Sequence, residues 1–208
     1  MKLLAQSTAT LSLAIKLRDE FAPDAPPLGT VSASLNDSTI KAFVKRATGE
    51  HLFIGLPAGK YTVRFHSTYY LEEACEVILP LPNARSPVLA VMLKPHRLYP
   101  FPSGTTLILG TVEDPDGHPV PGMHVRLTER AVGTRTGSDG KFVLYLKALT
   151  EDEVTTVVGR RLVKGNGGGH ALPISLNLPN YEPKTVTVKD VEEAKTTLVS
   201  TPIVVQPM

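Results

Sequence analysis

The stretch VEDPDGHPVPGMHVRL, residues 112–127, decides the fold of the second half of the chain. It contains five side chains that could carry out chemistry, namely Glu113, Asp114, Asp116, His118 and His124. The dipeptide Asp116-Gly117 strongly favours a tight turn, because glycine adopts a positive φ and aspartate bonds to its own backbone. Prolines on either side restrict the chain further. We therefore interpret the stretch as the turn between two β-strands, with its carboxylates in solvent.

A metal or acid/base site is the alternative interpretation of these side chains. Calcium takes about six to eight oxygen ligands, and an EF-hand loop spaces an acidic series that ends in glutamate. Zinc needs roughly three or four convergent ligands, whereas His118 and His124 lie at opposite ends of a turn and a strand. We expect no metal and no cofactor, with an adventitious ion in the turn as the open alternative. The segment Ser138-Asp139-Gly140 is interpreted in the same way, as a tight turn.

The composition bounds the function classes. The 208-residue chain is 42% hydrophobic and 20% charged, an ordinary globular balance, and its 18 prolines and 16 glycines favour many short strands over long helices. A net charge of +2 is too small to indicate nucleic acid or an anionic membrane as partner.

The N-terminal stretch MKLLAQSTATLSLAIKLRD predicts a strand rather than a targeting segment. Its apolar run is broken by Gln6, Ser7 and Thr8, whereas a secretory signal has an unbroken apolar segment of about 7–15 residues. No stretch reaches the ~20 apolar residues of a membrane span. We expect a cytoplasmic protein without membrane insertion, and release as part of a particle, without a signal peptide, stays open.

Residues 1–93 show the alternation of apolar and smaller or polar side chains that is typical of β-strands. It begins at residues 11–17, and FAPDAPPLG at residues 21–29 forms a proline-rich turn. Further strands are expected at residues 31–35, 40–45, 51–54, 61–65, 75–79 and 88–93. About seven short strands without a long helix predict an antiparallel β-sandwich.

The second half repeats the first. LILGTVEDPDGHPVPGMHVRL follows the pattern of LAIKLRDEFAPDAPPLGTVSASL, and later segments correspond in the same order, which indicates a tandem duplication. We therefore predict an all-β chain of two tandem antiparallel Greek-key β-sandwiches (Ig-like or transthyretin-like), at residues 1–93 and 105–208. A stiff proline-rich linker joins them at 94–104. The second copy holds an insertion at 148–169, a length typical of functional or disordered loops.

Three segments, GTV at 110–112, DGHPVPG at 116–122 and TGSDGKF at 136–142, resemble the carboxypeptidase regulatory-like domain, a transthyretin-like (prealbumin-like) β-sandwich. The resemblance covers residues 105–205, and the first half fits more loosely through PAGKYTVRF at 57–65. It implies a non-catalytic role in interaction or structure. The pairing of the copies around LYPFPSGTTL is also similar to small accessory proteins of phage-tail-like contractile injection systems.

Enzyme motifs are missing from the sequence. Neither G-x-S-x-G nor H-E-x-x-H occurs. The hydroxyisourate hydrolases of the transthyretin-like fold end in Tyr-Arg-Gly-Ser, whereas this chain ends in TPIVVQPM. We therefore predict that the protein is not an enzyme.

Protein–protein contact is the predicted function, as a structural component such as a cap or adaptor of a larger assembly, for example a contractile tail-like injection particle. An oligomer is compatible with this function. Edge strands and the insertion are the expected contact surfaces, because unpaired backbone groups invite strand addition. Within the insertion, Arg160, Arg161 and Lys164 could bind an anion or an acidic partner surface, although a solvated hairpin is the interpretation that the pattern favours.

The alternative function is a carbohydrate- or surface-binding module. Sugar sites generally use exposed aromatic rings as stacking platforms. The clustered aromatic candidates are Tyr69, Tyr70, Tyr99 and Phe101.

Overall fold

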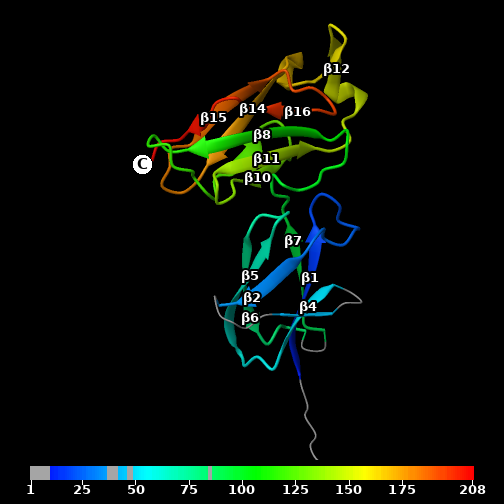
Figure 1. Cartoon of the computed structure of the whole chain (residues 1–208), viewed down its shortest axis with the longest axis vertical. Helices are drawn as coiled ribbons and strands as arrows, with labels where there is room; N and C mark the ends of the chain where they lie inside the picture. Colours follow the sequence, from blue (N-terminus) through cyan, green and yellow to red (C-terminus); the bar gives the residue numbers. More distant parts are fainter. Residues whose placement is uncertain (1–9, 37–41, 46–48, 84–85) are drawn as a thin grey trace, which may run out of the picture. The chain divides into compact units, whose positions relative to one another are not determined.

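The computed structural model describes residues 10–36, 42–45, 49–83 and 86–208. These residues form two compact units, divided between Pro95 and His96. Apart from two short 3₁₀ turns, Glu151–Glu153 and Asn166–Gly168, the regular elements of the described residues are all β-strands (Figure 1). The predicted all-β fold is therefore confirmed. Within the described ranges, no helix is long and apolar enough to cross a membrane.

The first unit packs a four-stranded sheet, in the order β3-β4-β1-β7, against a three-stranded sheet, β2-β5-β6. Alternate side chains of β1 and β5 enter the core between the sheets, where Leu13, Ile15 and Val63 are fully buried. The strands are β1 (Leu11–Asp19), β2 (Val31–Leu35), β3 (Phe43–Lys45), β4 (Glu50–Ile54), β5 (Gly59–Ser67), β6 (Glu73–Leu79) and β7 (Val88–Leu93). Each expected strand is found, although residues 40 and 41 of one prediction lie outside the described residues.

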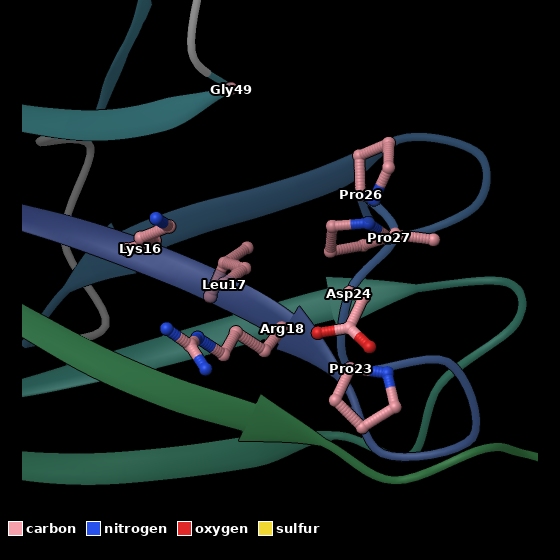
Figure 2. A pocket seen from close by; sticks show the side chains of 9 residues that line it. Lys16, Leu17, Arg18, Pro23, Asp24, Pro26, Pro27 and Gly49 are labelled. Atoms are coloured by element: carbon pink, nitrogen blue, oxygen red, sulfur yellow. The ribbon is translucent and has the colours of Figure 1, made fainter.

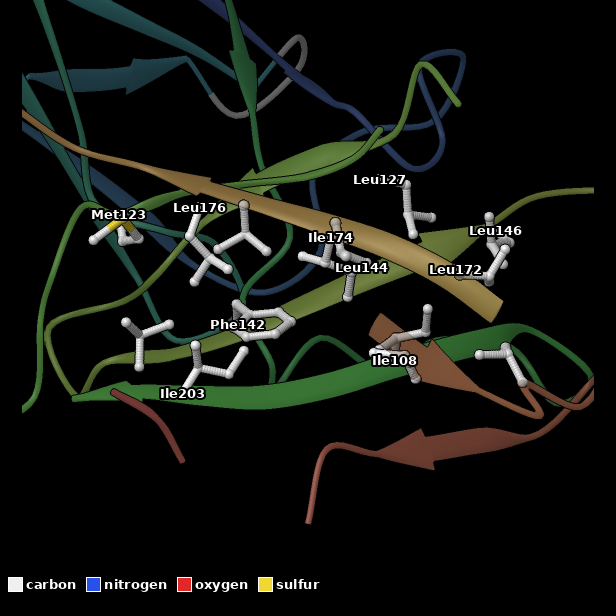
Figure 3. Close-up of a cluster of buried hydrophobic side chains, with 14 of the residues drawn as sticks. Ile108, Met123, Leu127, Phe142, Leu144, Leu146, Leu172, Ile174, Leu176 and Ile203 are labelled. Atoms are coloured by element: carbon white, nitrogen blue, oxygen red, sulfur yellow. The ribbon is translucent and has the colours of Figure 1, made fainter. Parts of the chain in front are cut away.

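The second unit has the same two-sheet plan. One sheet runs β10-β9-β14-β15, and the other runs β11-β8-β16, with β17 continuing beside β8. Figure 3 shows the core between them, with Phe142 and Leu144 of β11 packed against Ile174 of β14. The strands are β8 (Thr106–Glu113), β9 (His124–Leu127), β10 (Gly133–Arg135), β11 (Lys141–Leu146), β12 (Val154–Val157), β13 (Arg160–Val163), β14 (Ala171–Asn177), β15 (Lys184–Lys189), β16 (Thr196–Leu198) and β17 (Ile203–Val204).

The two units repeat one pattern of strand pairing. Strand β1 lies between antiparallel β4 and parallel β7, and β8 lies in the same way between antiparallel β11 and parallel β16. The third strand differs, because β3 pairs with β4 whereas β10 pairs with β9. The sheets are therefore antiparallel except where the first strand of each unit meets the last strands, a parallel contact that the sequence pattern does not predict.

The stretch at residues 112–127 is the turn that its dipeptide predicts. Strand β8 ends at Glu113 and β9 begins at His124. Between them, the Asp114 carboxylate accepts hydrogen bonds from the backbone N–H groups of Asp116 (2.9 Å) and His118 (2.8 Å). These bonds hold the chain in the tight turn at Gly117, whose φ is 81°.

The tight packing behind this turn can be tested with two glycine variants that share a positive φ. Gly140 has φ +69°, and a Cβ there would lie 2.6 Å from the Val112 carbonyl oxygen; Gly117 has φ +81° and open space around it. We expect Gly117→Ala to lower the free energy of unfolding by about 1–2 kcal/mol through its φ alone. Gly140→Ala should lower the free energy of unfolding by roughly 1–3 kcal/mol more than Gly117→Ala does, because the added methyl group overpacks the turn. Urea unfolding measures both, and equal losses would contradict this packing.

Candidate interaction surface

The outer face of the sheet β3-β4-β1-β7 carries an apolar row. Alternation along β4 sends His51 and Phe53 into the core and leaves Leu52 and Ile54 on the outer side. The strand register places Phe43 opposite Leu52, Leu52 opposite Ala14, and Ala14 opposite Val88. We call these four side chains, Phe43, Leu52, Ala14 and Val88, the outer row; it crosses all four strands of the sheet.

Large apolar side chains remain exposed on this face. Phe43 is 67% exposed, Ile54 50%, and Val88 and Met92 45% each. A solvated sheet face normally carries polar side chains, as β5 does with Arg64 and His66 on its outer side. Neighbouring exposed apolar side chains of this kind mark an interaction surface.

Two cations adjoin the outer row on the same face. Lys16 lies opposite Ala90 and Arg18 opposite Met92, one and two rows further along β1. They line a hollow of about 340 Å³ with Pro23, Asp24 and the prolines that follow (Figure 2). Among the residues that the structure describes, neither cation has an ion-pair partner. The surface thus combines an apolar row with two cations available to a partner.

Hydrogen bonds to buried side chains of the first unit fix the loop that lines this hollow, residues 20–30. The buried Tyr70 hydroxyl accepts a hydrogen bond from the Leu28 backbone N–H and donates one to the Asp19 carboxylate, each 2.8 Å long. The other Asp19 oxygen accepts from the Phe21 N–H at 2.7 Å. Burial raises the pKa of Tyr70, so the hydroxyl keeps its proton and the donated bond. The loop therefore has a defined position above β1.

The equivalent face of the second unit is covered by its own chain over β11, whereas Leu198 of β16 stays 67% exposed. There the register places Val143 opposite Leu109 and Leu109 opposite Leu198, the same row in a second copy. The centroid of the Phe101 ring lies 5.5 Å from that of Tyr145, which is the neighbour of Val143 on this side of β11. The Tyr99 ring is tilted against Phe101, with its centroid 4.7 Å away. Val143 is only 2% exposed. The segment following His96 thus covers the apolar outer side of β11.

The first two residues of the segment expected to be a stiff linker, residues 94–104, are bonded within the first unit. The Lys94 carbonyl accepts a hydrogen bond from the Leu71 N–H at 2.9 Å, and Pro95 bridges to Tyr70. From His96 onward the chain belongs to the second unit.

The four aromatic candidates for sugar stacking are engaged in packing. Tyr70 and Tyr99 are buried, which contradicts their expected exposure. The Phe101 ring is half-buried between Tyr99 and Tyr145, and the Tyr69 ring lies against Gly29. The hydrophobic effect explains the difference, because aromatic rings beside a sandwich core gain more from burial than from exposure.

The basic candidates of the insertion lie on and beside the hairpin β12–β13, and its arginines are paired with acidic side chains. Arg160 contacts Glu192 at 3.0 Å, while Arg161 binds Glu151 at 2.9 Å and also Glu193. The hydrogen bonds from Arg161 hold the pKa of Glu151 below its ordinary value. Lys164 follows the hairpin, and its backbone N–H donates to the Glu153 carbonyl at 2.8 Å. These bonds hold the insertion against its own unit. The charges of the two arginines are paired within the chain, so they are less available to a partner than the sequence suggests.

The tip of this hairpin has an unusual backbone. Val158 has φ 48° and is followed by Gly159 at φ 76°, a two-residue turn in which both residues are left-handed. Asparagine or glycine normally occupies the first of these positions, and a β-branched residue there is strained by about 1–3 kcal/mol. The Val158 side chain is 96% exposed, so contacts within the unit do not offset the strain.

The acidic–histidine turn brings Asp114, Asp116 and His118 together, with one potential ligand atom of each within 4.8 Å of the others. The hydrogen bond from the His118 N–H is the main cause that lowers the pKa of Asp114. These atoms already serve the turn, and His124 lies apart from them at the start of β9. The hydrogen bonds of the turn therefore explain why Asp114, Asp116 and His118 lie close together.

The sequence interpretation did not predict the outer row, although the apolar runs of two strands indicate it. Strand β7, VLAVML, is a continuous apolar run, and β4 is apolar at Leu52, Phe53 and Ile54. Such runs indicate strands that are covered on both faces. Counting apolar residues on each face separately would have found the surface.

Comparison with known proteins adds no functional conclusion. No protein-family model matches the chain, and no curated protein does. Among solved structures, a type II cohesin–X-dockerin complex from Acetivibrio cellulolyticus is 15% identical over 49% of this chain and 58% of that chain, with a TM-score of 0.32. The minor pilin of Streptococcus agalactiae is 14% identical over 95% and 97%, with a TM-score of 0.28. The shaft pilin SpaA of Lactobacillus rhamnosus GG is 12% identical over 97% and 99%, at 0.30.

Replacing the strained valine should stabilise the second unit. In Val158→Asn, asparagine tolerates the left-handed conformation that valine resists, so the free energy of unfolding should rise by about 1 kcal/mol. Val157→Asn is the matched control, because this neighbouring strand residue carries no positive φ. Thermal unfolding of the second unit measures both variants. A loss of stability in Val158→Asn would refute the strained turn.

Proposed function

We propose that the protein is a non-enzymatic interaction module, a cap or adaptor in a larger protein assembly, and that it binds its partner through the outer row of the first unit. One observation carries the proposal: both units have outward apolar side chains on equivalent strands, the chain covers those of β11 in the second unit, where Val143 is 2% exposed, and in the first unit Ile54 of the equivalent strand β4 is 50% exposed. Burying one such side chain contributes about 1.5–3 kcal/mol. The exposed side chains on and beside the row, Phe43, Ile54, Val88 and Met92, therefore supply a usable binding surface.

We further propose that the assembly is a contractile tail-like injection particle. The support for this placement is the sequence resemblance, namely the pairing of two sandwich copies around LYPFPSGTTL. Carbohydrate binding has weaker support, because Tyr70 and Tyr99 are buried.

The contact surface is tested by the same substitution on two sheets. Ile54→Glu places a charge beside the outer row, whereas Ile78→Glu places one on β6 of the opposite sheet, where the isoleucine is similarly exposed, at 68%. We expect the wild-type chain and Ile78→Glu to elute with a large complex from native cells, and Ile54→Glu to elute free, because the partner would have to bury an unpaired charge. Size-exclusion chromatography of the tagged full chain measures this.

Two results would refute the proposal: a wild-type chain that elutes alone, or an Ile54→Glu chain that stays in the complex. The composition of the complex tests the finer placement. Sheath, tube or baseplate proteins in it are expected for a contractile particle, and a complex without them contradicts that placement.

A further inference from the structure

The second unit shows what kind of chain segment covers this face. Residues 96–104, HRLYPFPSG, lie over the outer side of β11 and contribute two aromatic rings and two prolines. The segment forms no strand; its own backbone bonds, from Tyr99 to the His96 carbonyl and from Phe101 to the Tyr99 carbonyl, are each 2.9 Å long. Coverage therefore comes from ring packing on the sheet face rather than from strand addition.

The side chains beneath this segment have direct equivalents in the first unit. Matching the registers of the two sheets pairs Leu52 with Val143 and Ile54 with Tyr145. On the neighbouring strands, Val88 corresponds to Leu198, which the segment leaves 67% exposed. The first unit thus presents an apolar floor of the same outline, and a segment of the same chemistry fits it.

The charges of the two faces differ at one informative place. Extending the registers matches Lys16 with Thr111 and Arg18 with Glu113. In the second unit, Arg97 of the covering segment lines the same hollow as Thr111. The corresponding residue of a segment laid on the first unit would face Lys16, where an arginine is repelled and a carboxylate is attracted.

We propose that the partner covers the outer row with an irregular segment of proline and aromatic residues that carries an acidic side chain two positions before its first aromatic ring. This inference rests on the proposed function, because it names the partner chemistry of the same surface. The spacing is that of Arg97 and Tyr99 in the second unit. The ring packing supplies the contact, and the carboxylate selects this unit through Lys16 and Arg18.

Two peptides test the inference on the intact chain. One has the sequence of residues 96–104, and the other carries Arg97→Glu. Methyl NMR titration should show the acidic peptide shifting the signals of Ile54 and Leu52 in the full protein. The natural peptide should bind roughly three- to ten-fold more weakly at low salt, and the difference should shrink at high salt, because exposed charge pairs are weak and screened.

Variants of the full chain serve as controls. Lys16→Glu should remove or reverse the preference for the acidic peptide, Ile54→Glu should abolish binding of both peptides, and Ile78→Glu should leave binding unchanged. Failure of both peptides to bind, or equal affinity for the two, would overturn the inference. If Ile54→Glu also releases the chain from its native complex, the proposed function stands while the inference falls. If the native complex survives Ile54→Glu, the proposed function itself falls.

Discussion

A β-strand that is apolar on both of its faces requires cover on both, and the sandwich supplies cover on only one. Strands β4 and β11 are in this position. Their inward side chains are buried between the sheets, and their outward side chains continue the apolar rows across β1 and β8. The second unit meets the requirement with the Tyr99 and Phe101 rings. The first unit leaves it unmet among its described residues, and the proposed function follows from that difference.

Much of the fold could be predicted from local sequence signals. Alternation along residues 11–17 and the turn chemistry of Asp116-Gly117 depend on neighbouring residues alone, and both predictions are confirmed. The repeat of pattern between the halves is reflected in the neighbours of β1 and β8, although β3 and β10 join different sheets. The parallel contacts of β1 with β7 and of β8 with β16 could not be predicted, because they join the two ends of each unit and carry no local signal.

The candidate site was harder to predict because exposure is a property of the tertiary packing. A proline-rich segment without periodicity, such as residues 94–104, has the same sequence features whether it is a stiff linker or a cover for a sheet face. The aromatic side chains of Tyr70 and Tyr99 suggest stacking platforms in sequence, yet the core and the sheet bury them. In the same way, Arg161 appears as a free cation until the structure places Glu151 and Glu193 beside it.

In the second unit the outward apolar face of β11 is covered, with Val143 2% exposed, whereas in the first unit Ile54 of the equivalent strand β4 is 50% exposed and Val88 is 45% exposed. The most direct measurement of this difference is the relaxation enhancement of methyl signals by a soluble paramagnetic probe, recorded on the full chain in solution. Strong enhancement is predicted for Ile54 and Val88, and weak enhancement for Val143, which is 2% exposed. Protection of Ile54 and Val88 equal to that of Val143 would show that the first face is already covered and would contradict the account.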